Sequence, residues 1–388
     1  MIETSLSLPN GQVLPNRIVK SAMSERLSAS GRVTPSLHRL YAHWARGGAG
    51  LLITGNVMID ADHLGESGNV VVEDDRDLEA LRAWVEAARP AKIWMQINHP
   101  GRQSPRFVNK APVAPSAVPV EIAGAFVTPR ELTEPEILDI IERFANTAAV
   151  AEQAGFDGVQ IHGAHGYLVS QFLSPKTNRR EDAWGGDAER RRRFVVEVVR
   201  AIRARTSPSF AVGIKLNSAD FQKGGFTEEE SLAVVDAIGR DLDLIEVSGG
   251  TYESAVMFEE TQPKHDSSKR REAFFLDFAE RIREHTRVPL LVTGGFRTRA
   301  GMDDALETGA TDLVGLARPL ATEPDLPNRL LDGSAEAALP IKLATGIKKL
   351  DSMVQGGWYQ LQIQRMARGE TPDLKLSRIR AVVQAVAG

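Results

Sequence analysis

The segment GVQIHGAHGYL, residues 158–168, lies near the middle of the chain, and the rest of the sequence can be arranged around it. Its β-branched valine and isoleucine favour a short strand, and its glycines suit the irregular backbone that follows a strand. His162, His165 and Tyr167 therefore lie at a strand end. Imidazole and phenol groups at such a place can bind a polar atom of a ligand and supply a proton.

Composition and charge limit the classes of protein to consider. Hydrophobic residues make up 42% and charged residues 25% of the chain, which is typical of a soluble globular protein with a large core. The formal net charge of −4 offers no basic surface for nucleic acid or an anionic membrane. No apolar run approaches the roughly 20 residues that span a bilayer, and residues 1–10 lack a signal-peptide layout. The absence of cysteine excludes disulfides, thiolate nucleophiles and cysteine-bound metal, and we expect a cytoplasmic protein.

Apolar runs alternate with segments of helical period along most of the chain. The expected strands span residues 16–21, 50–54, 92–97, 158–162, 211–216, 243–248, 288–293 and 312–316. The expected helices span residues 35–46, 75–89, 133–154, 190–205, 227–240, 272–285 and 299–308. This alternation predicts an α/β fold of the (β/α)8 TIM-barrel type. A doubly wound sheet is the second choice, but no Gly-x-Gly-x-x-Gly follows any expected strand.

Segments outside the alternation are expected to close or extend the barrel. Residues 5–14 form an N-terminal β-hairpin around an Asn-Gly turn. Residues 99–132 show no clear period and several prolines, and a loop of that length is usually functional. We therefore assign residues 1–338 to one barrel domain. Residues 339–388 are expected to form a C-terminal helical extension that packs on the barrel or on a partner subunit of a homo-oligomer.

In barrel enzymes the chemistry lies at the C-terminal ends of the strands. The expected strand ends carry amide, imidazole, ammonium, hydroxyl and glycine groups and few carboxylates. They are Ala22, Met23, Ser24, Gly55, Asn56, Gln96, Asn98, His99, His162, His165, Lys215, Asn217, Ser248, Gly249, Gly250, Gly294, Gly295, Arg297, Ala317 and Arg318. Such a ring suits an anionic, hydrogen-bonding ligand better than a divalent metal.

The loops after the seventh and eighth strands indicate a phosphate site. Residues 294–297 read Gly-Gly-Phe-Arg, and Ala317 and Arg318 follow the eighth strand. Barrels commonly bind phosphate at this place through glycine backbone amides and a helix start, and arginine adds a forked cation. Each loop alone could be a tight turn with a surface charge, but the two together favour phosphate.

Other strand-end residues leave alternatives open. Lys215 could be a fixed cation beside an electron-rich ring, a Schiff-base lysine, or a solvated residue of the rim. Gln96 could contact the polar edge of a ring or cap a loop. His162 and His165 could share a metal ion or form a structural pair, but the neighbouring residues offer no third ligand.

At this point the motifs resemble the Old Yellow Enzyme family of FMN-dependent oxidoreductases, over residues 16 to about 331. The matching segments are 16–23 (NRIVKSAM), 99–103 (HPGRQ), 155–168 (GFDGVQIHGAHGYL), 171–175 (QFLSP), 178–186 (NRR to GG), 294–297 (GGFR) and 316–319 (LARP). The central block is the most specific of these.

The resemblance implies an FMN site and an ene-reductase mechanism. Ser24 would lie near the N5/O4 edge of the flavin, and Lys215 near its N1/O2 end. The implied FMN contacts are Ala22, Met23, Ser24, Gly55, Gln96, Lys215, Gly295, Ala317 and Arg318, the last three at the phosphate. NADH or NADPH would reduce FMN and leave, and an enone, enal, nitroalkene or maleimide would take its place. His162 and His165 would bind its oxygen, and Tyr167 would protonate the α-carbon after hydride transfer from N5.

The chain departs from the family pattern at two of these positions. Ser24 lies where threonine or cysteine is common, and Lys215 lies where arginine is common, so its contact lacks the guanidinium fork. The alternatives to the ene-reductase are a Schiff-base aldolase that depends on Lys215 and a non-catalytic flavin-binding protein.

Overall fold

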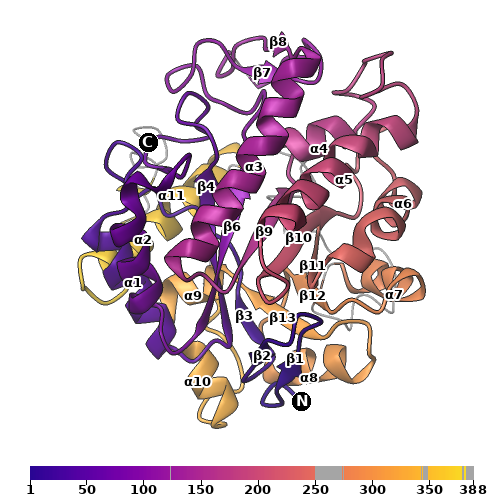
Figure 1. Cartoon of the computed structure of the whole chain (residues 1–388). Coiled ribbons are helices and arrows are strands. Elements are labelled where there is room, and N and C mark those ends of the chain that lie inside the picture. Colours follow the sequence, from indigo (N-terminus) through magenta and orange to yellow (C-terminus); the bar gives the residue numbers. More distant parts are fainter. Residues whose placement is uncertain are drawn as a thin grey trace.

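A computed structural model describes residues 1–122, 124–249, 273, 275–341, 343, 348–377 and 380–381. Within these residues, parallel strands form a closed ring that helices surround (Figure 1). The ring consists of β3 (Ile18–Lys20), β4 (Leu51–Met58), β6 (Lys92–Asn98), β9 (Gly158–Gly163), β10 (Ala211–Asn217), β11 (Leu244–Ser248), β12 (Leu290–Thr293) and β13 (Leu313–Leu316). Since β13 pairs with β3 and β3 with β4, the sheet has no open edge there. The predicted (β/α)8 barrel is confirmed, and the doubly wound sheet is wrong.

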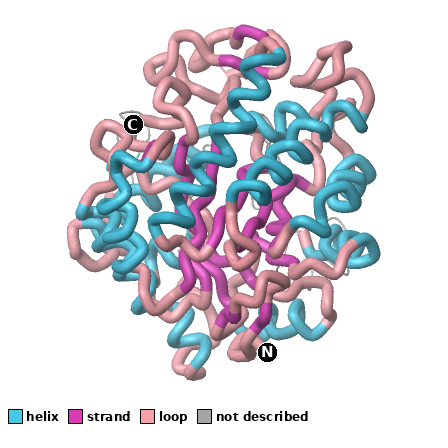
Figure 2. The backbone as a smooth tube through the Cα atoms, viewed as in Figure 1, coloured by secondary structure: helices cyan, strands magenta, loops and turns pink. Residues whose placement is uncertain are grey.

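Long helices cover the outside of the ring of strands (Figure 2). They are α1 (Pro35–Arg46), α2 (Leu78–Ala87), α3 (Glu134–Ala154), α5 (Ala188–Arg205), α6 (Glu228–Ile238), α7 (Leu276–His285) and α8 (Arg299–Glu307), with 3₁₀ turns η1 (Asp75–Asp77) and η2 (Gly239–Asp241). The predicted helices are confirmed with ends shifted by a few residues, and residue 272 lies outside the described part. α3 begins with a capping box between Thr133 and Glu136, and Gly155 ends it at φ +92°.

Several short elements are absent from the sequence prediction. They are α4 (Leu168–Leu173), α9 (Arg318–Thr322), α10 (Leu326–Leu331), β5 (Val70–Val71), β7 (Val113–Ala114) and β8 (Arg130–Glu131). Every residue of α4 is buried, so the helix shows no amphipathic period in the sequence. The other elements are as short or shorter, and a periodicity argument needs a longer window.

The N-terminal hairpin closes one end of the barrel. β1 (Leu6–Ser7) pairs antiparallel with β2 (Val13–Leu14), as predicted, and Gly11 in the turn has φ +87°. Leu8 and Leu14 join an apolar cluster with inward residues of the strands. Those residues are Val19, Leu51, Ile53, Trp94, Ala211, Leu244, Leu291 and Leu313.

The barrel interior changes from apolar to polar toward the C-terminal ends of the strands. Alternate residues of a strand face the same side, so the residue two positions after an inward apolar residue also faces inward. Trp94 is followed in this way by Gln96, and Leu244 by Glu246. The apolar layer seals the lower interior, and the polar layer above it lies where barrel enzymes bind their ligands.

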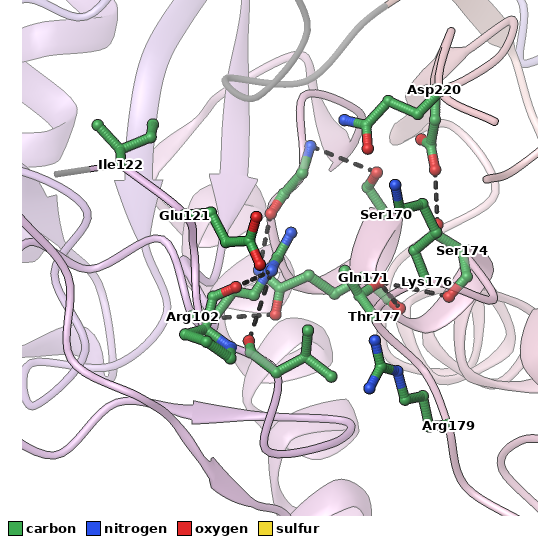
Figure 3. Close-up of a pocket in the computed structure, with 14 residues that line it drawn as sticks. Arg102, Glu121, Ile122, Ser170, Gln171, Ser174, Lys176, Thr177, Arg179 and Asp220 are labelled. Carbon is green, nitrogen blue, oxygen red and sulfur yellow. Dashed lines mark hydrogen bonds between the residues drawn. The ribbon is translucent and has the colours of Figure 1, made fainter. Parts of the chain in front are cut away.

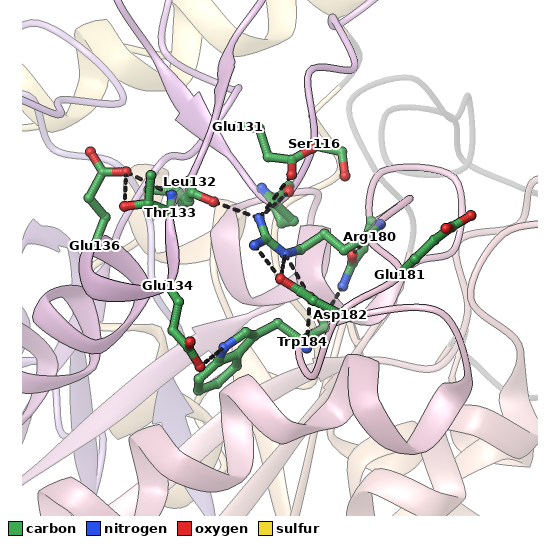
Figure 4. Close-up of polar contacts among 12 residues, drawn as sticks. Ser116, Glu131, Leu132, Thr133, Glu134, Glu136, Arg180, Glu181, Asp182 and Trp184 are labelled. Carbon is green, nitrogen blue, oxygen red and sulfur yellow. Dashed lines mark hydrogen bonds and ion pairs between the residues drawn. The ribbon is translucent and has the colours of Figure 1, made fainter.

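The buried side chain of Arg180 helps to fasten the long loop 99–132 to the rest of the protein (Figure 4). Its guanidinium donates to the carbonyl oxygens of Pro115 (3.0 Å) and Leu132 (2.6 Å). It also pairs with Asp182 (2.6 Å), whose carboxylate accepts from the backbone N–H of Trp184 (3.0 Å). We name this group the Arg180 clamp.

The helix α11 (Lys348–Ala367) lies beyond the barrel and packs on α1 and α9. The side-chain amide of Gln360 donates to the carbonyl oxygen of Glu25 (2.6 Å), in the loop after β3. Arg318 donates to the amide oxygen of Gln355 (3.1 Å). The division of the chain at residue 338 stays a prediction. No helix among the described residues is long and apolar enough to cross a membrane.

Candidate active site

The backbone after β9 brings His162, His165 and Tyr167 together. His165 has φ +62°, a conformation that is uncommon for a residue with a side chain. Its N–H donates to the side-chain oxygen of Asn217 (3.2 Å), and its carbonyl accepts from Gln103 (3.0 Å). The rings of His162 and His165 consequently meet edge to face, with centroids 5.1 Å apart. The ring of Tyr167 also lies beside that of His162, at 4.6 Å between ring centroids.

A chain of hydrogen bonds joins these rings to β4 and β11, each of which lies two strands away from β9 in the barrel. Ser248 Oγ lies 2.8 Å from His165 Nε2, and His165 Nδ1 lies 3.0 Å from His162 Nε2. His162 Nδ1 lies 2.8 Å from Asn56 Oδ1, and Asn56 Nδ2 lies 3.4 Å from Tyr167 Oη. The three residues singled out in the sequence therefore form one group, together with Asn56 of β4 and Ser248 of β11.

Both histidines are uncharged at neutral pH. Burial lowers the pKa of His162 well below its ordinary value, and the nearby His165 and Lys215 lower it further. Burial and Lys215 lower the pKa of His165 to about 3. Each neutral ring has one donor and one acceptor nitrogen. For both rings to donate to one ligand oxygen, the hydrogen bond between them must therefore open.

Gln96 and Lys215 lie at the two ends of a second buried chain, across the barrel interior. Gln96 Nε2 donates to Gln160 Oε1 (2.7 Å), and Gln160 Nε2 donates to Glu246 Oε2 (2.7 Å). Glu246 Oε1 then pairs with Lys215 Nζ at 3.0 Å. Lys215 is therefore held in an ion pair with a buried carboxylate of the neighbouring strand β11. Gln160 and Glu246 are absent from the sequence prediction, although inward alternation from His162 and Ser248 would have found both.

The loop after β3 is held against Gly55 by the carboxylate of Glu25. Glu25 Oε1 accepts from the N–H of Gly55 (2.9 Å) and from the phenol of Tyr41 (2.5 Å), with Lys20 Nζ at 3.5 Å. Burial lowers the pKa of Lys20 to about 8, against the opposing effect of Glu25. A Cβ at position 55 would lie 2.3 Å from the carbonyl oxygen of Met23, so this contact needs glycine.

The remaining implied FMN contacts lie at the same rim. The hydroxyl of Ser24, which follows Ala22 and Met23 in that loop, donates to the carboxylate of Glu66. Gly295 follows β12, and Ala317 and Arg318 follow the adjacent, paired strand β13. Gly295 has φ +100°, which favours glycine. The two loops chosen for phosphate are therefore neighbours at one edge of the barrel.

Asn98 shows that this rim suits a polar ligand. It lies two residues after Gln96 on β6, so it faces the same side, and its exposed fraction is 1%. Among the described residues, neither its amide oxygen nor its amide nitrogen has a hydrogen-bond partner. Buried polar atoms without a partner are few in native proteins. Such an amide fits the polar edge of a flavin or of the ligand beside it.

Asp60, His63 and His99 form the one group of possible metal ligands among the described residues. His63 Nδ1 lies 2.8 Å from Asp60 Oδ2, and the backbone N–H of Gly101 donates to His99 Nδ1 (3.0 Å). Burial lowers the pKa of His99 to about 3, so the ring is neutral and carries its proton on Nε2. A metal needs a lone pair on that nitrogen, and metal-bound histidines usually donate through the other one. We therefore assign no metal to this group.

A cavity of about 400 Å³ lies beside α4 and next to Gly166 (Figure 3). Loop 99–132 supplies one side with Arg102 and Glu121, and Ser174 and Asp220 lie on the opposite side. Burial raises the pKa of Asp220, and Ser174 donates to its carboxylate (2.6 Å). The cavity is bounded by charges of both signs, so its lining alone selects no ligand.

The fold and these groups are those of a barrel enzyme with a polar ligand site at the C-terminal ends of its strands. Comparison with known proteins agrees: the model of the NADH:flavin oxidoreductase / NADH oxidase family matches residues 6–336. NADH-dependent flavin oxidoreductase iccE of Talaromyces variabilis is 38% identical, over 94% of this chain and 97% of that protein. NADH-dependent flavin oxidoreductase nadA of Aspergillus parasiticus is 40% identical, over 84% of this chain and 77% of that protein.

Among solved structures, the old yellow enzyme homologue from Zymomonas mobilis has the same fold. Its TM-score is 0.74 at 24% identity, over 88% of this chain and 95% of that chain. The chain therefore belongs to the NADH:flavin oxidoreductase / NADH oxidase family, as its resemblance to the Old Yellow Enzymes indicated. It is an FMN-dependent enzyme that takes electrons from NADH or NADPH. The aldolase and the non-catalytic flavin protein are set aside.

Proposed function

We propose that the enzyme uses NADH to reduce carbon–carbon double bonds conjugated to a carbonyl or nitro group. Enones, enals, nitroalkenes and maleimides are the substrate class. The observation that carries this proposal is the close grouping of His162, His165 and Tyr167. His162 Nε2 lies 3.0 Å from His165 Nδ1, and the ring centroids of His162 and Tyr167 lie 4.6 Å apart. NADH is preferred in the proposal because the two fungal relatives above are named NADH-dependent.

Residues of the rim would hold FMN, which supplies the hydride exchange between reductant and alkene when bound. Gln96, at the end of its buried chain, would face the polar edge of the flavin ring, and Lys215 would place a positive charge near it. The full proposed set is Ala22, Met23, Ser24, Gly55, Gln96, Lys215, Gly295, Ala317 and Arg318. In this structure Lys215 forms an ion pair with Glu246, so it would not present an isolated positive charge to the flavin.

The two imidazoles would bind the oxygen of the substrate. His162 and His165 are neutral, so each has one N–H to donate once the bond between the rings and the bond from His162 to Asn56 open. Donation to a carbonyl or nitro oxygen withdraws electron density from the β-carbon and prepares it to accept a hydride. A phenolate resembles the enolate that follows, so phenols should bind at the same place.

Tyr167 would donate the proton to the α-carbon. Its ring lies beside that of His162, so a substrate whose oxygen reaches the histidines would have its carbon chain near the phenol. General acids at such positions typically contribute about 10²- to 10⁴-fold to a rate. Because the sequence has no dinucleotide fingerprint after any strand, nicotinamide and substrate would share one site in ping-pong order.

Steady-state kinetics test this proposal. Initial rates measured over crossed concentrations of NADH and 2-cyclohexenone should give parallel double-reciprocal lines, with the saturated ketone as product. Intersecting lines would contradict the shared site. If enones, enals, nitroalkenes and maleimides all fail to accelerate NADH oxidation without oxygen, the substrate class is wrong.

A further inference from the structure

Asn56 contacts both His162 and Tyr167 and has no place among the residues implied above. Its amide oxygen lies 2.8 Å from His162 Nδ1, and its amide nitrogen lies 3.4 Å from Tyr167 Oη. The pairing of β4 with β6 shifts register between Ile53 and Asn56, which sets Asn56 opposite Gln96. Such irregularities often redirect a side chain beside an active site. The register shift in β4 thus lies directly before the residue whose amide contacts the histidine–tyrosine group.

The two ends of the amide fix the proton positions in the histidine pair. An amide oxygen only accepts, so His162 carries its proton on Nδ1 and its Nε2 is a lone pair. That lone pair accepts from His165 Nδ1–H, and His165 Nε2 in turn accepts from the hydroxyl of Ser248. This chain of hydrogen bonds requires both rings to be neutral, because a protonated imidazole has no acceptor nitrogen. Burial keeps both rings neutral. All donors therefore point in one direction, from β11 toward Asn56.

The amide nitrogen of Asn56 donates to the phenol oxygen of Tyr167. The phenol oxygen is the acceptor in this bond, so the phenol's own proton is not used in it and remains available to a substrate. A phenol that gives up its proton becomes a phenolate, and a hydrogen bond to a charged oxygen is stronger than one to a neutral oxygen. The hydrogen bond from Asn56 to Tyr167 is therefore stronger after proton transfer than before it. This difference lowers the barrier to proton donation.

We propose that Asn56 is a positioning residue for proton transfer: it fixes the tautomer of His162 and supports the phenolate of Tyr167. The inference rests on the proton-donor role of Tyr167 under the proposed function. It adds a requirement that the tyrosine alone does not impose, namely an amide that donates to the phenol and accepts from the imidazole.

Two variants separate the two ends of the amide. Asn56→Leu removes both contacts at similar volume, and Asn56→Asp keeps the acceptor for His162 but replaces the donor to Tyr167 by a negative oxygen. In stopped-flow measurements on the FMN-loaded protein, both should be reduced by NADH within about threefold of the wild-type rate. Reoxidation by 2-cyclohexenone should slow about 10- to 100-fold, with a larger solvent deuterium isotope effect. Val57→Ala, at the adjacent buried position, is the control and should change neither half-reaction.

Nitrogen-15 spectra of histidine-labelled protein test the tautomer without turnover. The wild type and Asn56→Asp should show His162 protonated on Nδ1 alone, and Asn56→Leu should show protonated Nε2. Wild-type protein with His162 protonated on Nε2, or unchanged reoxidation in both variants, would overturn the proposal. If no enone reoxidises the wild type, the proposed function fails, and the wild-type spectrum still decides the tautomer.

Discussion

The Arg180 clamp and the histidine–tyrosine group follow the same strand, β9, and both lie in segments that match the family, yet their polar atoms behave differently. The guanidinium of Arg180 donates hydrogen bonds to two carbonyl oxygens and pairs with Asp182 (Figure 4). At the rim, the amide of Asn98 has no partner among the described residues, and His162 and His165 are bonded to each other. Polar atoms whose hydrogen bonds are all made within the protein stabilise the fold. Polar atoms that lack a partner, or whose partner a ligand can replace, are available for ligand binding.

The largest effect should come from the acid at the rim. Tyr167→Phe removes the proton donor and should slow reoxidation by an enone about 10²- to 10⁴-fold while leaving reduction by NADH intact. Stopped-flow absorbance measures the two half-reactions separately. Enone reduction at the wild-type rate would show that water or another acid delivers the proton.

The clamp should show the opposite behaviour, a loss of stability. Arg180→Met leaves two buried carbonyl oxygens without their donor and should lower the free energy of unfolding by about 2–4 kcal/mol. Urea denaturation measures this change. Arg179→Met, at the exposed neighbouring position, is the control and should stay within about 0.5 kcal/mol of the wild type. Equal losses in both variants would contradict the clamp.

The histidine pair should matter for ligand affinity. His162→Ala removes one of the two proposed donors to a phenolate oxygen and should weaken phenol binding about tenfold or more. Titration of the phenol-induced absorption band of the yellow protein measures the dissociation constant. An affinity equal to that of the wild type would place the ligand oxygen elsewhere.

The last prediction is a pH dependence. The folded-state pKa of His165 is about 3 and that of His162 is also lowered, against an ordinary value of 6.5. Below pH 6.5 the unfolded chain binds protons that the folded protein does not. Stability conferred by the neutral rings is therefore lost as pH falls from about 6.5 toward 3.

Urea denaturation at several pH values checks this sign, with His165→Asn as the comparison. The variant should lose less stability than the wild type between pH 6.5 and 4.5. Phenol affinity should stay flat from pH 6 to 8, and a step near pH 6.5 would show that a ring of the pair titrates there.

The barrel could be predicted because its strands are apolar runs separated by helices of clear period. The helix α4 could not, because six residues buried on every side leave no polar face to detect. Gln160 and Glu246 lay inside strands that appeared apolar, and only inward alternation shows that they face Gln96 and Lys215.

The site chemistry was predictable by residue type but not by arrangement. His162, His165 and Tyr167 were chosen from their spacing, but the bond between the histidines depends on the left-handed backbone at His165. Asn56 follows a register shift in β4, and no pattern of side chains in the sequence predicts that shift.

The visible spectrum of the FMN-loaded protein without oxygen tests the central claim most directly. We expect a yellow protein whose flavin absorption is bleached by one equivalent of NADH and restored by 2-cyclohexenone. A colourless protein that takes up no added FMN would contradict the cofactor site. A bleached protein whose colour no activated alkene restores would contradict the proposed reaction.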